Sequence, residues 1–239
     1  MSFKSKFNKY ARKIASALTH FDNEGLGKDP LCDMARRVQG SDLVIFDVGA
    51  NVGQSIERFK KYFPDAAMYS FEPSSKAFAL LEQKANAYTN VSPYKMALGA
   101  QSGEMTLFEN SSSDMNSFLE MGSGGSGEIV GQAVVSVKTI DQFCTENSIA
   151  KIDILKIDAQ GFDFEVIKGA KESILANKVK LLYFEIIFSE MYKNVPRFSE
   201  VYDFLLDHDF VLVSLYQFHY QEGLAGWTDG LFIHKSALQ

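Results

Sequence analysis

Residues 47–53 read Asp47-Val48-Gly49-Ala50-Asn51-Val52-Gly53 and stand between a short apolar run and an amphipathic pattern. The apolar run, Leu43-Val44-Ile45-Phe46, has the composition of a buried strand, and the residues from Gln54 onward place apolar side chains at helical spacing. Gly49 and Gly53 allow the backbone to turn tightly and a ligand to approach it closely. The helix start offers free N–H groups and a positive dipole end. The stretch therefore predicts a strand, a glycine turn and a helix that together bind a ligand.

An acidic residue ends the next predicted strand. Residues 67–71 are the apolar stretch Ala67-Met68-Tyr69-Ser70-Phe71, and Glu72 follows directly. An acid at the tip of the second strand of such a unit typically holds ribose hydroxyls. The glycine turn and Glu72 together predict a pocket for a cofactor that contains a nucleoside.

The glycine pattern argues against two common nucleotide pockets. The NAD fingerprint G-x-G-x-x-G needs glycine where this chain has Asn51 and Gln54, and no G-x-x-x-x-G-K-[ST] motif of an ATP-binding loop occurs. The pattern D-x-G-A-N-x-G, followed by Glu72-Pro73, instead resembles the S-adenosylmethionine pocket of class I methyltransferases. This cofactor has no phosphate and needs no triple glycine. The resemblance implies these cofactor-binding residues: Asp47, Gly49, Ala50, Asn51, Gly53, Glu72, Pro73, Met96, Ala97, Ser117 and Asp158.

Further blocks extend the resemblance from about Leu43 to Ile233. The most specific are the pair Leu155-Lys156-Ile157-Asp158-Ala159-Gln160-Gly161 and Val166-Ile167-Lys168-Gly169-Ala170, and Trp227-Thr228-Asp229-Gly230 stands near the end. The blocks and their order along the chain resemble those of the FkbM family of methyltransferases. The resemblance implies a Rossmann-like α/β fold, with a mostly parallel seven-stranded sheet and helices on both faces. It also implies O-methylation of a sugar, a glycan or a related metabolite. Gln160 stands where the family usually has Glu, so we assign it no acid–base role.

Length, charge and cysteine content limit the classes to which this protein can belong. At 239 residues the chain is long enough for one α/β domain with a large core. A net charge of −6 gives no global support to a nucleic-acid partner. Cys32 and Cys144 show no metal-binding spacing, so we expect reduced thiols in a cytoplasmic protein. Residues 1–20 lack a signal-peptide pattern and no run of 18 apolar residues occurs, so no transmembrane segment is expected.

The first 40 residues are expected to be a helical extension, and residues 41–239 the S-adenosylmethionine-binding methyltransferase domain. Residues 3–19 have the pattern of a basic amphipathic helix, with Phe3, Phe7 and Tyr10 near one face. Such a helix either docks on the domain or makes a peripheral contact with a membrane or partner.

From Leu43 onward strands and helices alternate, which predicts a mostly parallel sheet covered on both faces. The predicted strands are 43–48, 67–71, 92–97, 103–109, 133–138, 152–158, 179–188, 210–216 and 230–234. The predicted helices are 54–63, 75–88, 139–147 and 199–208. Residues 110–128 are rich in Ser and Gly, which predicts a flexible segment. It is either a lid over the pocket or a surface loop, and Asn116-Ser117-Phe118 is the part we expect a ligand to order.

Asp158, at the end of the strand 152–158, is the first catalytic candidate. A carboxylate beside the expected sulfonium could orient the cofactor, accept the proton of a hydroxyl acceptor, hold a metal ion or cap the following helix. Lys156 shares its strand face and is either a second catalytic candidate or a structural residue, because a buried lysine needs a carboxylate partner. Asp158, Glu185 and Glu165 are the candidates for that partner.

Two further residues are candidates for catalysis. Glu185 interrupts an apolar strand and could form a two-carboxylate magnesium site with Asp158, so the question of a divalent metal stays open. His219 stands in the loop 217–228 and could be a general base. The aromatic residues of this loop, Phe218, Tyr220 and Trp227, either stack on a sugar or form a packing cluster.

Together these features predict a cytoplasmic S-adenosylmethionine-dependent O-methyltransferase with a small-molecule or glycan acceptor and no nucleic-acid partner. Two alternatives remain. One is an NAD-dependent nucleotide-sugar oxidoreductase or epimerase, and the other is a non-catalytic cofactor-binding protein.

Overall fold

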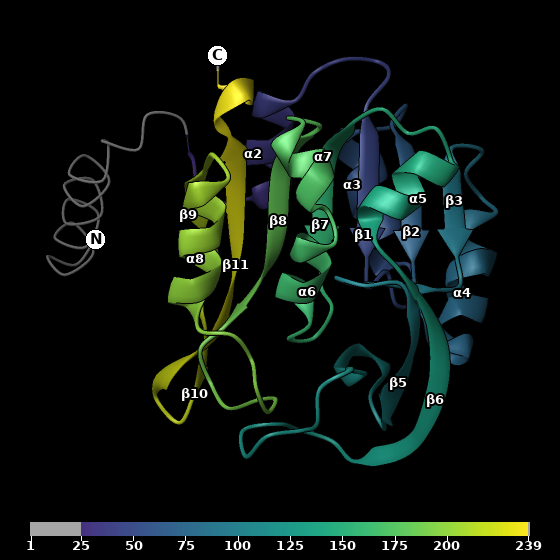
Figure 1. Cartoon of the computed structure of the whole chain (residues 1–239), viewed down its shortest axis with the longest axis vertical. Coiled ribbons are helices and arrows are strands. Elements are labelled where there is room, and N and C mark those ends of the chain that lie inside the picture. Colours follow the sequence, from purple (N-terminus) through teal and green to yellow (C-terminus); the bar gives the residue numbers. More distant parts are fainter. Residues whose placement is uncertain (1–24, 239) are drawn as a thin grey trace, which may run out of the picture.

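A computed structural model describes residues 25–238 (Figure 1). The predicted helix 3–19, with its proposed membrane or partner contact, lies outside these residues. Within the described range, no helix has both the length and the apolar composition needed to cross a membrane.

The core of the fold is an eight-stranded sheet in which the strand order along the main path is β10-β11-β8-β7-β1-β2-β3, and β9 pairs with β11. The strands are β1 (Val44–Val48), β2 (Ala67–Phe71), β3 (Val91–Tyr94), β7 (Ile152–Ile157), β8 (Val179–Ile187), β9 (Phe210–Leu215), β10 (His219–Gln221) and β11 (Leu224–His234). The neighbouring strands β3, β2, β1, β7 and β8 pair in parallel. Strand β11 runs antiparallel to its neighbours β8, β9 and β10. The α/β class with a mostly parallel sheet is confirmed.

Helices cover both faces of the sheet, as the alternation of elements predicts (Figure 1). Helices α2 (Pro30–Arg37), α3 (Gln54–Tyr62) and α4 (Ser75–Ala85) pack Met34, Ile56 and Leu81 against one face. Helices α5 (Ile140–Glu146), α6 (Asp163–Lys168), α7 (Lys171–Leu175) and α8 (Phe198–Asp207) cover the other.

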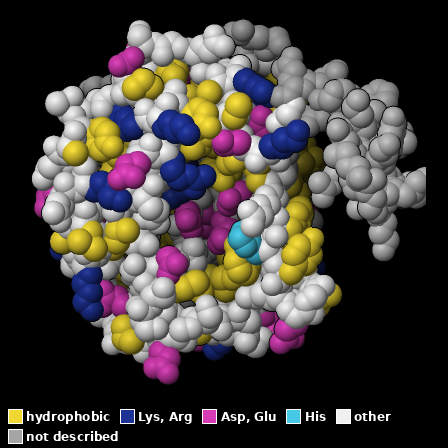
Figure 2. All heavy atoms as spheres, turned by 180° about the vertical axis from the view of Figure 1, so that it is seen from behind, with side chains coloured by type: hydrophobic (Ala, Val, Ile, Leu, Met, Phe, Trp, Pro, Cys, Tyr) yellow, Lys and Arg dark blue, Asp and Glu magenta, His cyan; other side chains and the backbone are white. Residues whose placement is uncertain are grey.

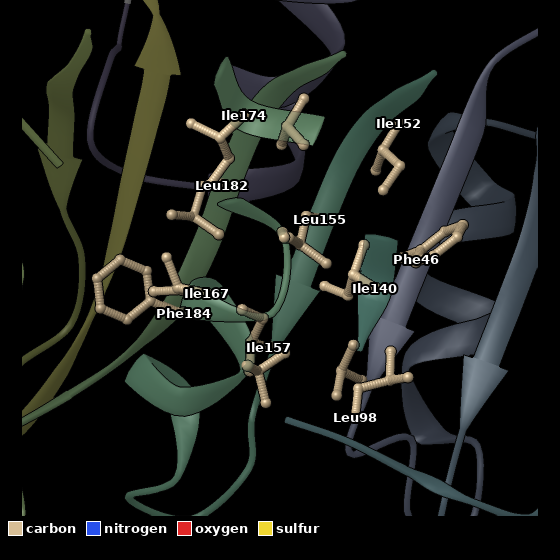
Figure 3. Close-up of a cluster of buried hydrophobic side chains, with 14 of the residues drawn as sticks. Phe46, Leu98, Ile140, Ile152, Leu155, Ile157, Ile167, Ile174, Leu182 and Phe184 are labelled. Carbon is tan, nitrogen blue, oxygen red and sulfur yellow. The ribbon is translucent and has the colours of Figure 1, made fainter. Parts of the chain in front are cut away.

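The inner strands are apolar on both faces because each face is covered by helices. In β1, Ile45 belongs to the cluster under α3 while Phe46 belongs to the cluster under α5. Figure 3 shows the second cluster, where Leu155 and Leu182 from neighbouring strands face Ile140, Ile167 and Ile174 from the helices. Leucine and isoleucine side chains of this kind each stabilise the fold by about 1.5–3 kcal/mol when fully buried.

The strand boundaries differ from the sequence prediction in three places, and the strand count of the main sheet is eight rather than seven. The strand predicted at 92–97 is divided between β3, which ends at Tyr94, and β4 (Ala97–Leu98). The predicted loop 217–228 contains β10 and the first part of β11, which form an antiparallel hairpin. The strand predicted at 133–138 is β6 (Ile129–Lys138) and starts earlier. It joins β4 (Ala97–Leu98) and β5 (Gly103–Asn110) in a separate three-stranded sheet. Figure 1 shows β5 and β6 below the carboxyl ends of β1 and β7.

Helix α2 falls inside the predicted extension 1–40 but packs on the main sheet. Asp29 caps its N-terminus by accepting the N–H groups of Leu31 and Cys32, at 2.9 and 3.4 Å. The hydroxyl of Tyr216, which follows β9, donates to Oδ2 of the buried Asp33 at 2.9 Å. This part of the extension is therefore joined to the domain core, and the boundary at residue 41 stays a prediction.

Candidate active site

A cavity, about 600 Å³ when the space open to solvent is included, opens at the carboxyl ends of β1, β2 and β7, which is where ligands bind in open α/β sheets. Its lining comes from three strand ends, from β4 and β5 and from the segment after β5. The lining residues are Val48, Gly49, Asn51, Gln54, Phe71, Glu72, Pro73, Met96, Ala97, Leu98, Leu107, Ser113, Asp114, Asn116, Phe118, Asp158, Ala159 and Gln160. Seven of the predicted cofactor residues lie in this set: Gly49, Asn51, Glu72, Pro73, Met96, Ala97 and Asp158.

Gly49 has to be glycine because two strand tips meet there. Its φ is +69°, and a Cβ at this position would lie 1.8 Å from the carbonyl oxygen of Asp158. Gly53 has a φ of +77° and is the residue before α3, where a Cβ would contact Ile56 and Leu81 at 3.1 Å. Gly53 does not line the cavity, so its role is to start the helix rather than to contact a ligand.

Glu72 is the most precisely held acid of the cavity. Its Oε2 accepts the N–H of Asn51 at 2.9 Å and its Oε1 accepts the N–H of Ser74 at 2.8 Å. The side chain is 6% exposed, and this burial raises its pKa to about 7 against the two N–H groups that lower it. An ionised carboxylate has about four acceptor sites, so about two remain for a ligand.

Asp47 and Lys156 do not face the cavity, because they bind each other. They stand opposite one another in the β1–β7 register, and the Lys156 Nζ lies 2.8 Å from the Asp47 Oδ1. Burial lowers the pKa of Lys156, but the charges of Asp47, Asp158 and Asp163, together with the hydrogen bond to Asp47, outweigh burial and raise the pKa. The ion-pair partner of Lys156 is therefore Asp47, and not the predicted Asp158, Glu185 or Glu165. Asp47 does not line the cavity, and its contact with the cofactor stays a prediction.

This ion pair also supports the glycine turn. The Lys156 Nζ donates to the carbonyl groups of Gly49 at 3.1 Å and of Val48 at 3.4 Å, while Ser55 donates to the Asp47 Oδ2. A buried lysine is costly unless it is paired and hydrogen-bonded, and here both conditions hold. Lys156 is therefore a residue that positions the turn.

Residues 111–118, here called the strap, cross the mouth of the cavity. The Ser113 Oγ donates to the Asn51 Oδ1 at 3.0 Å, and the Ser117 Oγ donates to the carbonyl of Gln160 at 2.7 Å. Phe118 packs on Phe162, with their ring centroids 5.0 Å apart. Ser117 itself does not line the cavity, but it ties the strap to the segment that carries Asp158.

A short chain of hydrogen bonds fixes Asp158. The Gln160 Nε2 donates to the Asp158 Oδ1 at 2.7 Å, and the Tyr192 hydroxyl donates to the Gln160 Oε1 at 2.7 Å. Gln160 has a φ of +52°, a left-handed conformation that side chains other than glycine rarely adopt. The amide orientation of Gln160 follows from both contacts, since only a nitrogen can donate to a carboxylate.

Glu185 lies with other acids near Asp158. Burial raises its pKa, and the charges of Asp158, Asp163 and Asp229 raise it further. In the β8–β11 register Glu185 stands opposite Asp229, which accepts a hydrogen bond from the Tyr183 hydroxyl at 2.6 Å. Figure 2 shows acidic side chains on the floor of a hollow in the middle of one face of the molecule. Glu185 does not line the 600 Å³ cavity but an adjoining one.

His219 is exposed and stacks on Trp227, with ring centroids 4.7 Å apart. It is not among the residues that line the cavity. Phe218 stacks on Phe188 at 6.1 Å, so the aromatic residues form a partly exposed cluster on the β10–β11 hairpin. Within residues 25–238, no group of three or more His, Cys, Asp and Glu side chains is arranged to hold a metal ion.

Several lining residues, Gln54, Ser113, Asp114 and Gln160, are not among the predicted site residues. Asn116 and Phe118, which also line the cavity, belong to the part of segment 110–128 that we expect a ligand to order. The strap residues lie about 40 positions before Asp158 in a Ser/Gly-rich segment, so no spacing rule joins them to the strand ends. Gln160 was available in the sequence block around Asp158, but its amide was discounted because it is not an acid. Ala50 is fully buried in the core under α3 and does not line the cavity.

Comparisons with known proteins agree with this geometry. The profile of the methyltransferase FkbM domain matches residues 47–212. The 2-O-methyltransferase NoeI of Sinorhizobium fredii is 24% identical over 181 residues, which cover 71% of this chain and 74% of the relative. The hexuronic acid methyltransferase AglP of Haloferax volcanii is 26% identical over 136 residues, 56% of this chain and about half (52%) of that protein.

Solved structures show the same fold. Magnesium protoporphyrin IX methyltransferase (ChlM) of Synechocystis, with bound S-adenosylmethionine, superposes with a TM-score of 0.51 at 12% identity, over 86% of this chain and 76% of that one. The fibrillarin pre-rRNA processing protein of Methanococcus jannaschii has a TM-score of 0.51 at 15% identity, over 88% and 71%. Since the family profile covers more than half of the sequence, this chain belongs to the FkbM methyltransferase family.

Proposed function

We propose that this protein is an S-adenosylmethionine-dependent O-methyltransferase that acts on a hydroxyl group of a sugar or glycan. The observation that carries the proposal is the Glu72 carboxylate, fixed by two backbone N–H groups beside the glycine turn with acceptor sites left over. Two ribose hydroxyls match those sites. When bound, the cofactor supplies an electrophilic methyl group.

The cavity fits the three parts of this cofactor. Glu72 would hold the ribose, and Asp158 with the turn at Gly49 would receive the charged amino-acid end. The apolar lining that includes Leu98, Leu107 and Phe118 would receive the adenine. The turn offers no triple glycine for a pyrophosphate, so the family match and the site both favour this reading over the NAD-dependent alternative.

Asp158 is the group proposed to take the proton of the acceptor hydroxyl. As the methyl group passes from the cofactor sulfur to the acceptor oxygen, the methyl–sulfur bond would break and leave S-adenosylhomocysteine. The acceptor O–H bond would break in the same step, and its proton would pass to the Asp158 carboxylate. Gln160 donates to one oxygen of Asp158, which holds the carboxylate in place and leaves the other oxygen for the acceptor. General base catalysis of this kind contributes about 10²–10⁴-fold in rate.

The relatives' names support a carbohydrate acceptor, since one is a 2-O-methyltransferase and one acts on hexuronic acid. The aromatic cluster of the β10–β11 hairpin gives a surface on which a sugar ring could stack. The net charge of −6 supports an acceptor other than nucleic acid, and the two free cysteines support a cytoplasmic location.

The test measures binding and turnover separately. Calorimetry should show binding of S-adenosylhomocysteine and no binding of NAD. Transfer of a labelled methyl group to a panel of glycans should then occur with wild type and fall by about 10²–10⁴-fold in Asp158→Asn at saturating cofactor. Asp207→Asn, an exposed change on α8, is the matched control and should leave the rate unchanged. Tighter binding of NAD than of S-adenosylhomocysteine would refute the proposed cofactor. Normal turnover by Asp158→Asn would refute the role of Asp158 as the base. Cofactor binding with no transfer to any glycan would leave the non-catalytic alternative.

A further inference from the structure

A second cavity, about 320 Å³ when the space open to solvent is included, follows the first along the chain: residues 158–160 line the first, and Gly161 and Asp163 line the second. Its walls are mostly apolar, from residues that include Phe164, Phe184, Ile186 and Phe198. The only charged residues that line it are Asp163 and Glu185. Like many small-molecule sites, it combines an apolar wall with a few polar groups.

Both acids present oxygen atoms that lack a partner. Within residues 25–238, the Asp163 Oδ2 and the Glu185 Oε2 are buried and make no hydrogen bond. Asp163 is 4% exposed, and its other oxygen accepts only a long hydrogen bond, 3.4 Å, from the N–H of Ala159. A buried polar atom without a partner is costly, so these two oxygens mark a place where a hydrogen-bond donor is missing.

The charges around Asp163 and Glu185 determine which kind of hydrogen-bond donor fits these two acids. Glu185 stands directly opposite Asp229 in the sheet, an arrangement that destabilises a protein when both groups are charged. Burial, together with the neighbouring charge of Asp158, raises the pKa values of both Asp163 and Glu185. Like the second cavity, the first has no lysine, arginine or histidine among its described lining residues. The nearest buried cation, Lys156, is already bound to Asp47 and two carbonyl groups.

We infer that the second cavity is the acceptor subsite, and that it takes a sugar that carries no negative charge near the reacting hydroxyl. The inference rests on the proposed function and narrows its acceptor class. Hydroxyl or ammonium groups of the acceptor would donate to Asp163 and Glu185. A carboxylate or phosphate would meet acids alone, without the arginine or lysine that usually binds such groups. This sets the chain apart from its relative that acts on hexuronic acid.

The experiment uses three methyl glycosides that differ in one group: glucosamine, glucose and glucuronic acid. Their binding to the full chain loaded with S-adenosylhomocysteine is measured by saturation-transfer NMR, which detects weak binding. We expect the amino sugar to bind best and the uronate to bind at least about tenfold more weakly than the neutral glycoside, because among the described residues no cationic side chain lines either cavity to pair with a carboxylate that leaves water. Added salt should reduce the difference in affinity between the uronate and the neutral glycoside.

Glu185→Gln keeps the shape of the side chain and removes its charge. Glu185 can lose its proton when it pairs with an ammonium group, whereas the amide of the Glu185→Gln variant cannot become charged. The ratio of the affinity for the amino sugar to that for the neutral glycoside should therefore fall toward one in this variant. Glu82→Gln, an exposed change on α4, removes one charge elsewhere and should leave the preference intact. If Glu185→Gln does not fold, the order of the wild-type affinities for the three glycosides tests the inference by itself.

Binding of the uronate equal to or tighter than that of the neutral glycoside would overturn the inference, as would no binding of any glycoside. Either result leaves the proposed function standing if the chain binds S-adenosylhomocysteine and methylates a glycan. Failure to bind the cofactor product would instead overturn the proposed function, and the inference with it.

Discussion

The ionisation of Glu72 sets the pH range in which the cofactor can bind. Accepting two ribose hydroxyls requires the carboxylate form, but burial raises the pKa of Glu72 from 4.5 to about 7. Below that pH the folded protein holds the acid mainly protonated, so a growing fraction of molecules cannot bind. Affinity for S-adenosylhomocysteine should therefore fall by about tenfold for each pH unit below about 7, and level off above it.

Calorimetry between pH 5.5 and 8.5 would measure this dependence. Glu72→Gln removes the titrating group, so its affinity should be lower at high pH and nearly independent of pH. Glu57→Gln, an exposed change on α3, is the control and should keep the wild-type profile. An unchanged wild-type affinity across pH 7 would show that Glu72 is not the ribose ligand.

Gln160 is predicted to keep Asp158 available as a base. Its amide N–H lies 2.7 Å from the Asp158 Oδ1, so Gln160→Glu would place two carboxyl groups at hydrogen-bond distance. Two carboxylates this close cannot both ionise easily, so one proton would be shared between them. The acid limb of the profile of kcat against pH should shift upward, with activity recovered at higher pH. If wild type and Gln160→Glu had the same profile of kcat against pH, Gln160 would not be the residue that keeps Asp158 available as a base.

At the residue scale, the sequence identified the strand-end positions but not the partners. Glu72 and Asp158 line the cavity because each directly follows an apolar strand, and a continuous apolar run that ends at a turn signal locates a strand end well. Asp47 and Lys156 are different, because their pairing depends on the register between β1 and β7. That register is set by packing of elements more than 100 residues apart, which a local pattern does not encode.

Among the elements, the strap has the most direct consequence for binding. Ser117 donates to the Gln160 carbonyl and so connects the strap to the Asp158 segment. Ser117→Ala should weaken cofactor binding by about two- to tenfold, the effect of one hydrogen bond. It should also speed amide exchange in residues 111–118. Ser136→Ala, exposed on β6, should change neither quantity. Equal exchange in the strap with and without S-adenosylhomocysteine would make the strap a passive surface segment.

The β10–β11 hairpin shows why one element was missed. Its turn residues, Glu222 and Gly223, both have positive φ, at 50° and 82°, as in a type I′ turn. Asn-Gly and Asp-Gly are the usual signals for this turn, and Glu-Gly is not. The strands β1, β2 and β7 were predicted within one residue because long apolar runs between turn signals are unambiguous.

At the scale of the whole molecule, one buried ion pair joins stability to function. Asp47 and Lys156 lie in the middle of the sheet, with side chains 0% and 11% exposed. Lys156 also donates to the carbonyls of the glycine turn, so the same side chain neutralises a core charge and shapes the cofactor site. Removing one partner leaves the other charge buried and unpaired, which costs about 3–5 kcal/mol, whereas an apolar replacement of both is often neutral.

A double-mutant cycle would separate these two roles. Asp47→Leu and Lys156→Met should each lower the free energy of urea unfolding by about 3–5 kcal/mol, and the double variant should recover most of that loss. Cofactor binding should not recover, because the double variant still lacks the ammonium group that holds the carbonyls of Val48 and Gly49. Lys180→Met, whose ammonium pairs with Asp153 at the opposite end of the sheet, is the matched control and should leave binding unchanged. If the double variant bound S-adenosylhomocysteine as tightly as wild type, the pair would serve the fold alone, and the shape of the glycine turn would not depend on Lys156.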